Sequence, residues 1–356
     1  MADNLNLSAA RTAKNDEFYT QYEDIEAEMN AYVEYNPDVF RDKTILLPCD
    51  DPDWSNFTLY FEANFKRYGI RKLISTSYAK SSGNQKLTSA EQDSPLFDAE
   101  KRMTHGRLFV MTRDDQEDKF SGYLQGDGDF RSAEVTALRD EADVIITNPP
   151  FSLFREFLAW IQPEKRKFCI IGNQNAITYK EVFPLLKNNT IWLGAPFIAG
   201  NAYFFIPNTL NTAKYADGVF DAQKGLVKFR NCKWYTNLDH GMRHEPLLLD
   251  TMAHNLKYNK KLRRKLENTY GTVAYPHYDN YDALEVPFTE CIPSDYNGVM
   301  GVPITFMDKY SPEQFEIIGN LVTNNPEYFS YGVPYCFGRK IYARILIRPK
   351  KGGASA

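Results

Sequence analysis

Four residues near the middle of the chain, Asn148-Pro149-Pro150-Phe151, have types and an order that suit one reaction. The lone pair of an exocyclic amine is delocalised into its ring, so an acceptor must polarise the amine before it attacks a methyl group. The Asn148 side-chain oxygen and the Pro149 carbonyl oxygen can both accept hydrogen bonds from such an amine. The two prolines stiffen the loop, and Phe151 offers a ring face to an extruded base. The tetrapeptide therefore predicts methyl transfer to a planar amine, with a plain Pro-Pro turn as the alternative.

The segment 48–57 is a second candidate site and holds three carboxylates, those of Asp50, Asp51 and Asp53. It contains no glycine-rich phosphate loop, and three carboxylates would repel a phosphorylated nucleotide. A zwitterionic cofactor with a cationic sulfur tolerates them, and a helix that begins near Ser55 adds free backbone amides as donors. We therefore expect a cofactor at this loop, with an acidic helix-capping loop as the alternative.

Two further patterns follow strands. Asp51-Pro52-Asp53-Trp54 resembles the tetrapeptide but lacks its second proline, so we assign this pattern to the cofactor and Asn148-Pro149-Pro150-Phe151 to the amine. In Gly126-Asp127-Gly128-Asp129-Phe130, the Asp129 carboxylate can accept from an adenine amino group while Phe130 lies on the ring. The alternative for this second pattern is an ordinary glycine-aspartate turn.

Alternating strands and helices must position these loops. Apolar runs predict strands at 44–47, 71–76, 108–111, 143–147 and 168–171, and amphipathic runs predict helices at 24–35, 56–68, 132–139, 153–161 and 179–187. Strands separated by helices predict an α/β fold with a doubly wound, mostly parallel, Rossmann-like sheet. In such a sheet ligands bind at the carboxyl ends of the strands, which is where the three candidate loops fall.

The second half of the chain has a different pattern. Short aromatic strands are predicted at 201–206 and 233–236, and a Tyr- and Pro-rich stretch covers 275–303. No composition shift marks a linker between the two patterns. We predict a soft domain boundary near residue 245, with a catalytic domain at 1–245 and a smaller target-recognition region at 246–356.

Composition excludes several classes of protein. Hydrophobic residues at 43% and charged residues at 25% are typical of a soluble globular protein of about two domains. The polar N-terminus lacks a signal-peptide pattern, and no apolar run is long enough to span a bilayer, so we expect a cytoplasmic protein that has no membrane partner. Five widely spaced cysteines indicate reduced thiols. His240, His244 and Glu245 form no metal-binding frame, and we expect no metal.

A net charge of −4 means that any contact with nucleic acid requires a local basic patch. One candidate is the segment 257–265, which contains six lysines and arginines; the alternative is a solvated helix face. Further along, hydrogen-bonding side chains are candidates for reading bases, with an ordinary surface loop as the alternative for each. These candidates are Tyr275, His277, Tyr278 and Asn280.

Five longer strings make the chain resemble a known family, the adenine-specific DNA methyltransferases of the EcoRI type. These strings lie at 14–20, 49–57, 148–151, 234–240 and 302–310, so the resemblance covers nearly the whole chain. It implies S-adenosylmethionine as the cofactor and double-stranded DNA as the partner, with N6 of adenine as the acceptor. A cognate restriction endonuclease would act separately, in a restriction-modification or phage system.

The resemblance also implies residue roles. Phe18, Tyr19 and Thr20 line the cofactor pocket together with the 50–56 loop. The residues of that loop are Asp50, Asp51, Trp54, Ser55 and Asn56. Asp129 and Phe130 contact the adenine of the cofactor, and Asn148, Pro149, Pro150 and Phe151 hold the target amine. The acidic loop departs from the glycine-rich pattern of most methyltransferases.

The predicted mechanism is direct methyl transfer to an adenine rotated out of the duplex, without a covalent enzyme intermediate and without a strong general base. Two alternatives use the same residues. The first is an enzyme that methylates RNA adenine or a protein glutamine, because an Asn-Pro-Pro-aromatic loop suits any planar amine. The second is a DNA-binding protein that has kept the fold but does not turn over.

Overall fold

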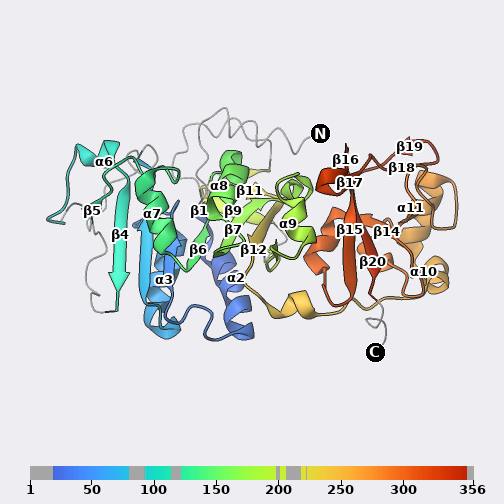
Figure 1. Cartoon of the computed structure of the whole chain (residues 1–356), viewed down its shortest axis with the longest axis horizontal. Helices are drawn as coiled ribbons and strands as arrows, with labels where there is room; N and C mark the ends of the chain where they lie inside the picture. Colours follow the sequence, from blue (N-terminus) through green and yellow to red (C-terminus); the bar gives the residue numbers. More distant parts are fainter. Residues whose placement is uncertain are drawn as a thin grey trace. The chain divides into compact units, whose positions relative to one another are not determined.

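The computed structural model describes residues 19–79, 92, 94–113, 122–197, 201–205, 218–221 and 223–350 of the chain. The chain forms two compact units (Figure 1). Unit 1 contains Met1–Gln174 and Leu193–His240, and unit 2 contains Asn175–Trp192 and Gly241–Ala356. The functional division at residue 245 stays a prediction.

An eight-stranded sheet forms the centre of unit 1, in the order β5-β4-β3-β2-β6-β7-β12-β8. Its strands are β2 (Thr44–Leu47), β3 (Lys72–Thr76), β4 (Arg107–Thr112), β5 (Gly122–Tyr123), β6 (Val144–Thr147), β7 (Lys167–Asn173), β8 (Trp192–Leu193) and β12 (Cys232–Thr236). The four central strands, β3, β2, β6 and β7, are parallel. β4 and β12 run antiparallel to the strands beside them.

The α/β prediction is confirmed, and the sheet is mixed rather than mostly parallel. The apolar runs identified the strands β2, β3, β6 and β7 to within two residues at either end. Their periodicity has no information on direction, because a buried strand shows the same run of apolar residues whichever way it points.

One face of the sheet is covered by α2 (Tyr22–Tyr35) and α3 (Asn56–Tyr68). Ile45 and Leu47 of β2 pack into one core with the aromatic side chains of α3. α3 begins at Ser55, whose side chain accepts from the Phe57 amide, and ends at Gly69 with φ 63°. These caps fix the start of α3 at the carboxyl end of β2.

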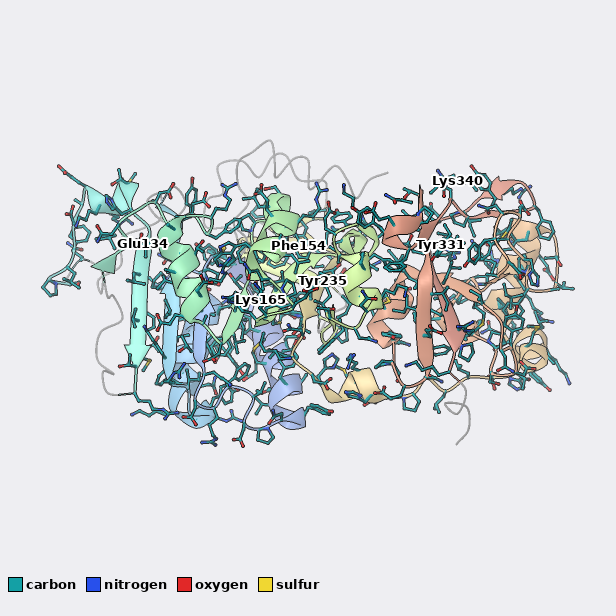
Figure 2. All side chains as sticks on the ribbon, in the orientation of Figure 1. Glu134, Phe154, Lys165, Tyr235, Tyr331 and Lys340 are labelled. Atoms are coloured by element: carbon teal, nitrogen blue, oxygen red, sulfur yellow. The ribbon has the colours of Figure 1, made fainter. Side chains whose placement is uncertain are left out.

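The opposite face is covered by α8 (Phe154–Ile161), with α7 (Ala133–Glu141) before β6 in the chain. Phe154 lies over Gly172, where a Cβ would come within 2.3 Å of its ring, and its centroid is 5.1 Å from that of Tyr235. Figure 2 labels Phe154 and Tyr235. α6 (Lys101–Thr104) is a single short turn.

A second, four-stranded sheet of unit 1 has the order β1-β9-β11-β10. Its strands are β1 (Tyr19–Thr20), β9 (Ala202–Phe205), β10 (Phe220–Asp221) and β11 (Leu226–Phe229). Phe204 and Phe229 join the same core as α3. This small sheet therefore brings the start of the described chain to the large sheet.

Unit 2 contains a six-stranded sheet in the order β13-β14-β20-β15-β17-β16 and a hairpin of β18 and β19. The strands are β13 (Leu284–Glu285), β14 (Met300–Pro303), β15 (Phe315–Leu321), β16 (Asn324–Asn325), β17 (Ser330–Tyr331), β18 (Tyr335–Cys336), β19 (Arg339–Lys340) and β20 (Arg344–Pro349), and the helices are α9 (Phe183–Lys187), α10 (Met252–Tyr258) and α11 (Lys260–Tyr270). Within the described residues, no helix has the length and apolar character needed to cross a membrane.

Candidate active site

Asp50 ties the acidic loop to the strand that precedes the Asn-Pro-Pro-Phe loop. Its carboxyl oxygens accept from Ser55 Oγ and from Thr147 Oγ1, both at 2.6 Å, and the side chain is buried. Burial raises the pKa of this carboxyl from 3.8 to about 7, against the opposing effect of the two hydrogen bonds. Asp50 thus braces the carboxyl ends of β2 and β6, and Asn148 follows Thr147 directly.

The N-terminal segment reaches the same loop from another direction. Asn56 Nδ2 donates to the Thr20 carbonyl oxygen at 2.7 Å, and Thr20 lies opposite Phe204 in the β1–β9 pair. Tyr19 lies opposite Phe205 in that pair. Phe18 lies outside the described residues. The structure therefore brings Tyr19 and Thr20 to the start of α3, next to the loop with which the sequence grouped them.

Strands β9 and β11 contact the Asn-Pro-Pro-Phe loop at Phe151. The Phe151 ring meets Phe204 and Phe229 edge to face, with centroids 6.0 and 5.7 Å apart. Phe204 in turn lies opposite Thr20. The N-terminal segment, the acidic loop and the Asn-Pro-Pro-Phe loop are thus linked to one another by side-chain contacts in unit 1.

Two buried polar atoms at this place have no hydrogen-bond partner in the part of the chain that the structure describes. They are the Trp54 indole Nε1, a donor, and the Thr20 hydroxyl Oγ1. A buried polar group without a partner costs about 1–3 kcal/mol, so such groups are rare unless water or a ligand satisfies them. Both residues belong to the predicted cofactor pocket, and both atoms can hydrogen-bond a polar ligand.

Two of the three carboxylates of the acidic loop share one arginine that the sequence analysis missed. Arg107 Nη1 lies 3.1 Å from Asp51 Oδ1 and 3.2 Å from Asp53 Oδ2, and the guanidinium is fully buried. The acidic loop is therefore much less negative than its sequence indicates. The available signal was an arginine directly before the apolar run 108–111, since an arginine that becomes buried is almost always paired.

The 126–130 loop packs closely on the end of β3. Gly128 has φ 81°, and a Cβ there would lie 2.1 Å from the Ser77 carbonyl oxygen, so only glycine fits. The Ala79 amide donates to the Asp127 carbonyl at 2.8 Å. The Asp50 amide donates to the Thr76 carbonyl at 2.9 Å, which places both loops at the same edge of the sheet.

Within this loop the two predicted contact residues already have neighbours. Hydrogen bonds from Arg131 lower the pKa of the Asp129 carboxyl, and the two side chains form a partly exposed ion pair at 2.6 Å. Phe130 is 4% exposed, and its ring packs against Phe157 and Trp160. Asp129 can accept a further hydrogen bond, whereas Phe130 has little ring surface left for a ligand.

The Asn-Pro-Pro-Phe loop is partly exposed to solvent and is held in place at both of its ends. Asn148 and Pro150 are partly exposed, Pro149 is buried, and a short 3-10 turn, Phe151–Leu153, follows. The loop is thus held by β6 on one side and by the phenylalanine cluster on the other. Two acceptors on a rigid loop, beside an aromatic ring, can orient a planar amine.

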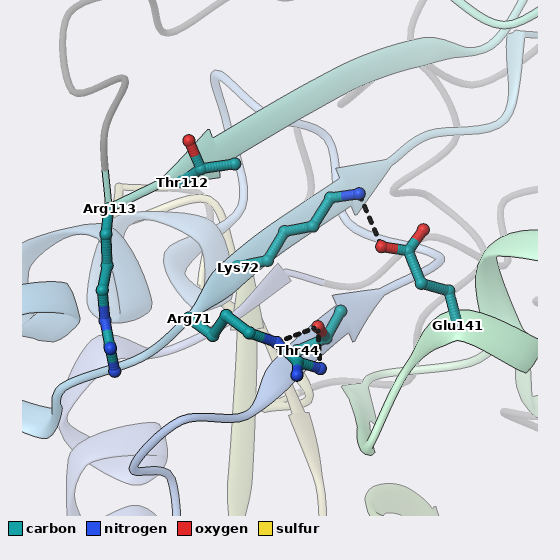
Figure 3. A pocket seen from close by; sticks show the side chains of 6 residues that line it. All are labelled: Thr44, Arg71, Lys72, Thr112, Arg113 and Glu141. Atoms are coloured by element: carbon teal, nitrogen blue, oxygen red, sulfur yellow. Dashed lines mark hydrogen bonds and ion pairs between the residues drawn. The ribbon is translucent and has the colours of Figure 1, made fainter.

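A hollow lies at the opposite edge of the same sheet, where β2 and β3 begin (Figure 3). Thr44, Arg71, Lys72, Thr112, Arg113 and Glu141 line it. Lys72 pairs with Glu141 at 2.6 Å, Arg71 pairs with Asp143 at 3.0 Å, and Arg113 pairs with Asp42. The predicted site residues lie at the other ends of these strands.

Comparisons with known proteins point to one family. The family model described as adenine-specific methyltransferase EcoRI matches residues 6–350. The type II methyltransferase M.EcoRI of Escherichia coli is 40% identical over 350 residues, which cover 98% of each chain. Two mycoplasma type II methyltransferases also match: M.MpnI of Mycoplasma pneumoniae is 29% identical, and M.MgeORF184P of Mycoplasma genitalium is 30% identical, each over 97% of this chain and at least 98% of its own. No solved structure matches the chain.

Proposed function

Because the chain belongs to the family of EcoRI-type adenine-specific DNA methyltransferases, we propose that the linked loops of unit 1 form its active site. The chain is an adenine-specific type II DNA methyltransferase of a restriction-modification system, and the resemblance seen in its sequence is confirmed. The family implies a Rossmann-like, doubly wound methyltransferase fold for unit 1. The observation that supports the site is the meeting of three distant segments through Asp50–Thr147, Asn56–Thr20 and Phe151–Phe204.

We propose S-adenosylmethionine as the methyl donor, and the residues at the site fit it. Trp54 Nε1 and Thr20 Oγ1 are buried polar atoms that a polar ligand would satisfy. Asn56 and Tyr19 flank them, and the Asp129 carboxylate is available to an adenine amino group. When bound, this cofactor supplies an electrophilic methyl group on a cationic sulfur.

Three other residues of the acidic loop act indirectly in this proposal. The Asp50 carboxylate accepts hydrogen bonds from Ser55 and Thr147. Asp50 and Ser55 therefore maintain the shape of the pocket. Asp51 keeps Arg107 in place. Because Arg107 pairs with Asp51 and Asp53 and offsets one of their two charges, the pocket holds less negative charge than three free carboxylates would give it.

The chain's own residues orient the acceptor. The N6 amino group donates to Asn148 Oδ1 and to the Pro149 carbonyl oxygen, which turns its lone pair out of the ring plane and towards the methyl group. Phe151, fixed by Phe204 and Phe229, supports one face of the extruded base. With the cofactor bound, the methyl group would leave sulfur as it bonds to N6, and the amine would then lose a proton to solvent, so no strong base is needed.

The partner we propose is double-stranded DNA, contacted mainly by the region 246–356. A cognate restriction endonuclease acts on the same sequence as a separate protein, and no membrane partner is proposed. A DNA substrate also agrees with the cytoplasmic location that the sequence predicted.

Label transfer tests the substrate class. Purified protein is mixed with S-adenosylmethionine labelled with tritium in the methyl group and offered duplex DNA, RNA and protein in parallel. We expect label only in DNA, as N6-methyladenine after hydrolysis to nucleosides. Label found only in RNA or protein contradicts the proposal. Sequencing of methylated bases in expressing cells then identifies the recognition site.

A further inference from the structure

The hairpin of β18 and β19 in unit 2 presents an aromatic side chain at its tip. Phe337 and Gly338 connect the strands, with φ values of 52° and 72°. The Phe337 side chain is 59% exposed. Glycine or asparagine suits such a turn, whereas phenylalanine with a positive φ is strained. The tip thus combines a strained backbone with an apolar ring in water.

Hydrogen bonds with two neighbouring side chains, Asp279 and Asn280, hold this tip in place. One carboxylate oxygen of Asp279 accepts from the Phe337 amide at 2.9 Å and the other from the Gly338 amide at 2.7 Å. Asn280 Nδ2 donates to the Val333 carbonyl at 2.9 Å, at the base of the hairpin. Since neither the strain nor the exposed ring stabilises unit 2, the cost of holding them indicates a use outside the fold.

The second strand of the hairpin, β19, is positively charged and contacts α11. Arg339 and Lys340 follow the tip, and Arg339 Nη1 donates to the Thr269 carbonyl at the end of α11 at 3.0 Å. Figure 1 shows the hairpin and α11 as neighbours within unit 2, and Figure 2 labels Lys340 on the hairpin. The hairpin and α11 therefore form one surface, which we call the hairpin–α11 surface.

α11 carries cations that the fold does not use. Leu262, Leu266 and Tyr270 are buried and attach the helix to unit 2. Five exposed cations lie on its remaining surface, together with Glu267. They are Lys260, Lys261, Arg263, Arg264 and Lys265. Of these five, only Lys261 has a carboxylate partner among the described residues, Glu290 at 2.9 Å.

Two other arginines of unit 2 do have carboxylate partners. Arg344 pairs with buried Glu285 at 2.7 Å, and Arg348 pairs with Glu316 at 2.8 Å. The other four cations of α11 form no ion pair among the described residues, so no salt bridge explains their place on this short helix. Their charge complements a polyanion, and phosphates spaced along a duplex are such a partner.

We propose that the hairpin–α11 surface binds duplex DNA, with its cations on phosphates and Phe337 inserted as a wedge between stacked bases. Apolar side chains on a rigid support insert in this way, and the unstacking bends the duplex. The inference rests on the proposed function, because DNA is the occupant. It goes further by naming the residues that distort the substrate, which neither the sequence motifs nor the relatives assign.

Bending measurements test the wedge. The probe is a duplex that carries the site mapped in expressing cells and a dye at each end, so that energy transfer reports the bend. The wild type should bend the probe, Phe337→Leu should keep most of the bend, and Phe337→Ala and Phe337→Gly should lose it, with affinity lowered about 10-fold. Leu248→Ala removes another exposed apolar side chain of unit 2, 90% exposed, and should change nothing.

Phe337→Gly separates the wedge from a structural role. Glycine relieves the positive φ, so the variant should unfold at an equal or higher temperature while it loses the bend. Wild-type-like bending by Phe337→Gly, or a wild type that methylates DNA without bending it, overturns the wedge and leaves the proposed function intact. If the wild type does not methylate DNA, the proposed function itself fails.

Salt dependence tests the phosphate contacts. The double substitution Arg263→Ala with Arg264→Ala should lower the slope of log affinity against log salt by about 2, since each lost phosphate contact removes roughly 0.9. Lys180→Ala with Lys350→Ala removes two exposed cations elsewhere in unit 2 and should leave the slope unchanged. Equal slopes for both double variants overturn this part of the inference.

Discussion

The two edges of the parallel strands in unit 1 are both rich in charge, yet they differ in how that charge is held. At the carboxyl edge, Asp50 and Arg107 are buried, and Trp54 Nε1 and Thr20 Oγ1 have no partner among the described residues. At the amino edge, Lys72 and its neighbours form ion pairs that are partly or largely open to solvent. Burying polar atoms without partners costs free energy, and of the two edges the carboxyl edge is where such atoms lie. A bound ligand could hydrogen-bond them.

This difference shows that a surface hollow alone does not identify a functional site. The amino-edge hollow of Figure 3 has an exposed rim, and its three cations each have a carboxylate beside them. The carboxyl edge gains its chemistry from topology, because the strands lead there into helix starts such as Ser55. Four predictions sharpen this comparison.

The largest effect is expected at Asn148. Asn148→Ala removes one of the two acceptors for the target amine, and the turnover number should fall by about 100-fold or more. Binding of the cofactor and of duplex DNA should stay close to the wild type, as measured by calorimetry and fluorescence anisotropy. Methylation at wild-type rates contradicts the assignment of the catalytic loop.

The buried carboxyl of Asp50 should make stability depend on pH. Its pKa is about 7 in the folded protein and 3.8 in a model peptide, so the folded state binds the extra proton between these values. The stabilisation is complete below about pH 4, decreases as pH rises, and is lost above 7. We expect the stability of the wild type relative to Asp50→Asn to fall across this window by a few kcal/mol, on the order of 1.4 kcal/mol per pKa unit.

Glu28 provides the matched control for that measurement. Burial raises the pKa of its carboxyl from 4.5 to about 8, and it lies in the core rather than at the site. The same comparison with Glu28→Gln should therefore give a decrease that continues to about pH 8. Denaturant unfolding at a series of pH values measures both. A flat difference for Asp50→Asn means that the carboxyl is not protonated in the fold.

A smaller effect is expected at Trp54. Trp54→Phe keeps the aromatic ring and removes only the Nε1 donor, so unfolding should change little. Loss of one hydrogen bond should weaken S-adenosylmethionine binding by about 0.5–1.5 kcal/mol, which calorimetry resolves. Trp160→Phe is the control, because Trp160 Nε1 on α8 donates to Thr136 Oγ1 on α7 at 3.1 Å, away from the candidate site. Equal cofactor affinity in wild type and Trp54→Phe removes Trp54 from the pocket.

The smallest effect is expected at the amino edge. Lys72→Ala breaks a partly exposed pair with Glu141 and should cost about 0–1 kcal/mol of stability, with no change in methylation rate. The measurements are thermal unfolding and initial rates of label transfer. A tenfold loss of methylation rate would mean that this edge takes part in the reaction, which contradicts the difference drawn between the two edges.

Local elements were predictable because their signals are local. The strand 44–47 and the helix 56–68 have the bounds that were predicted, since apolar runs, the Ser55 cap and Gly69 lie within the elements they define. For two of the residues predicted to contact DNA bases, no local signal shows whether the side chain is exposed. Tyr275 and Tyr278 are buried, and their hydroxyls donate to the Cys291 carbonyl and to Glu285.

The sequence by itself identified the family and the main strands and helices of the parallel part of unit 1, and it predicted a role for the tetrapeptide. Only the tertiary structure decided that Asp50 meets Thr147 across 97 residues, that Arg107 neutralises Asp51 across 56, and that Phe204 supports Phe151. Such contacts depend on which strands become neighbours and in which direction they run. That choice minimises the free energy of the whole core, and no short stretch of sequence encodes it.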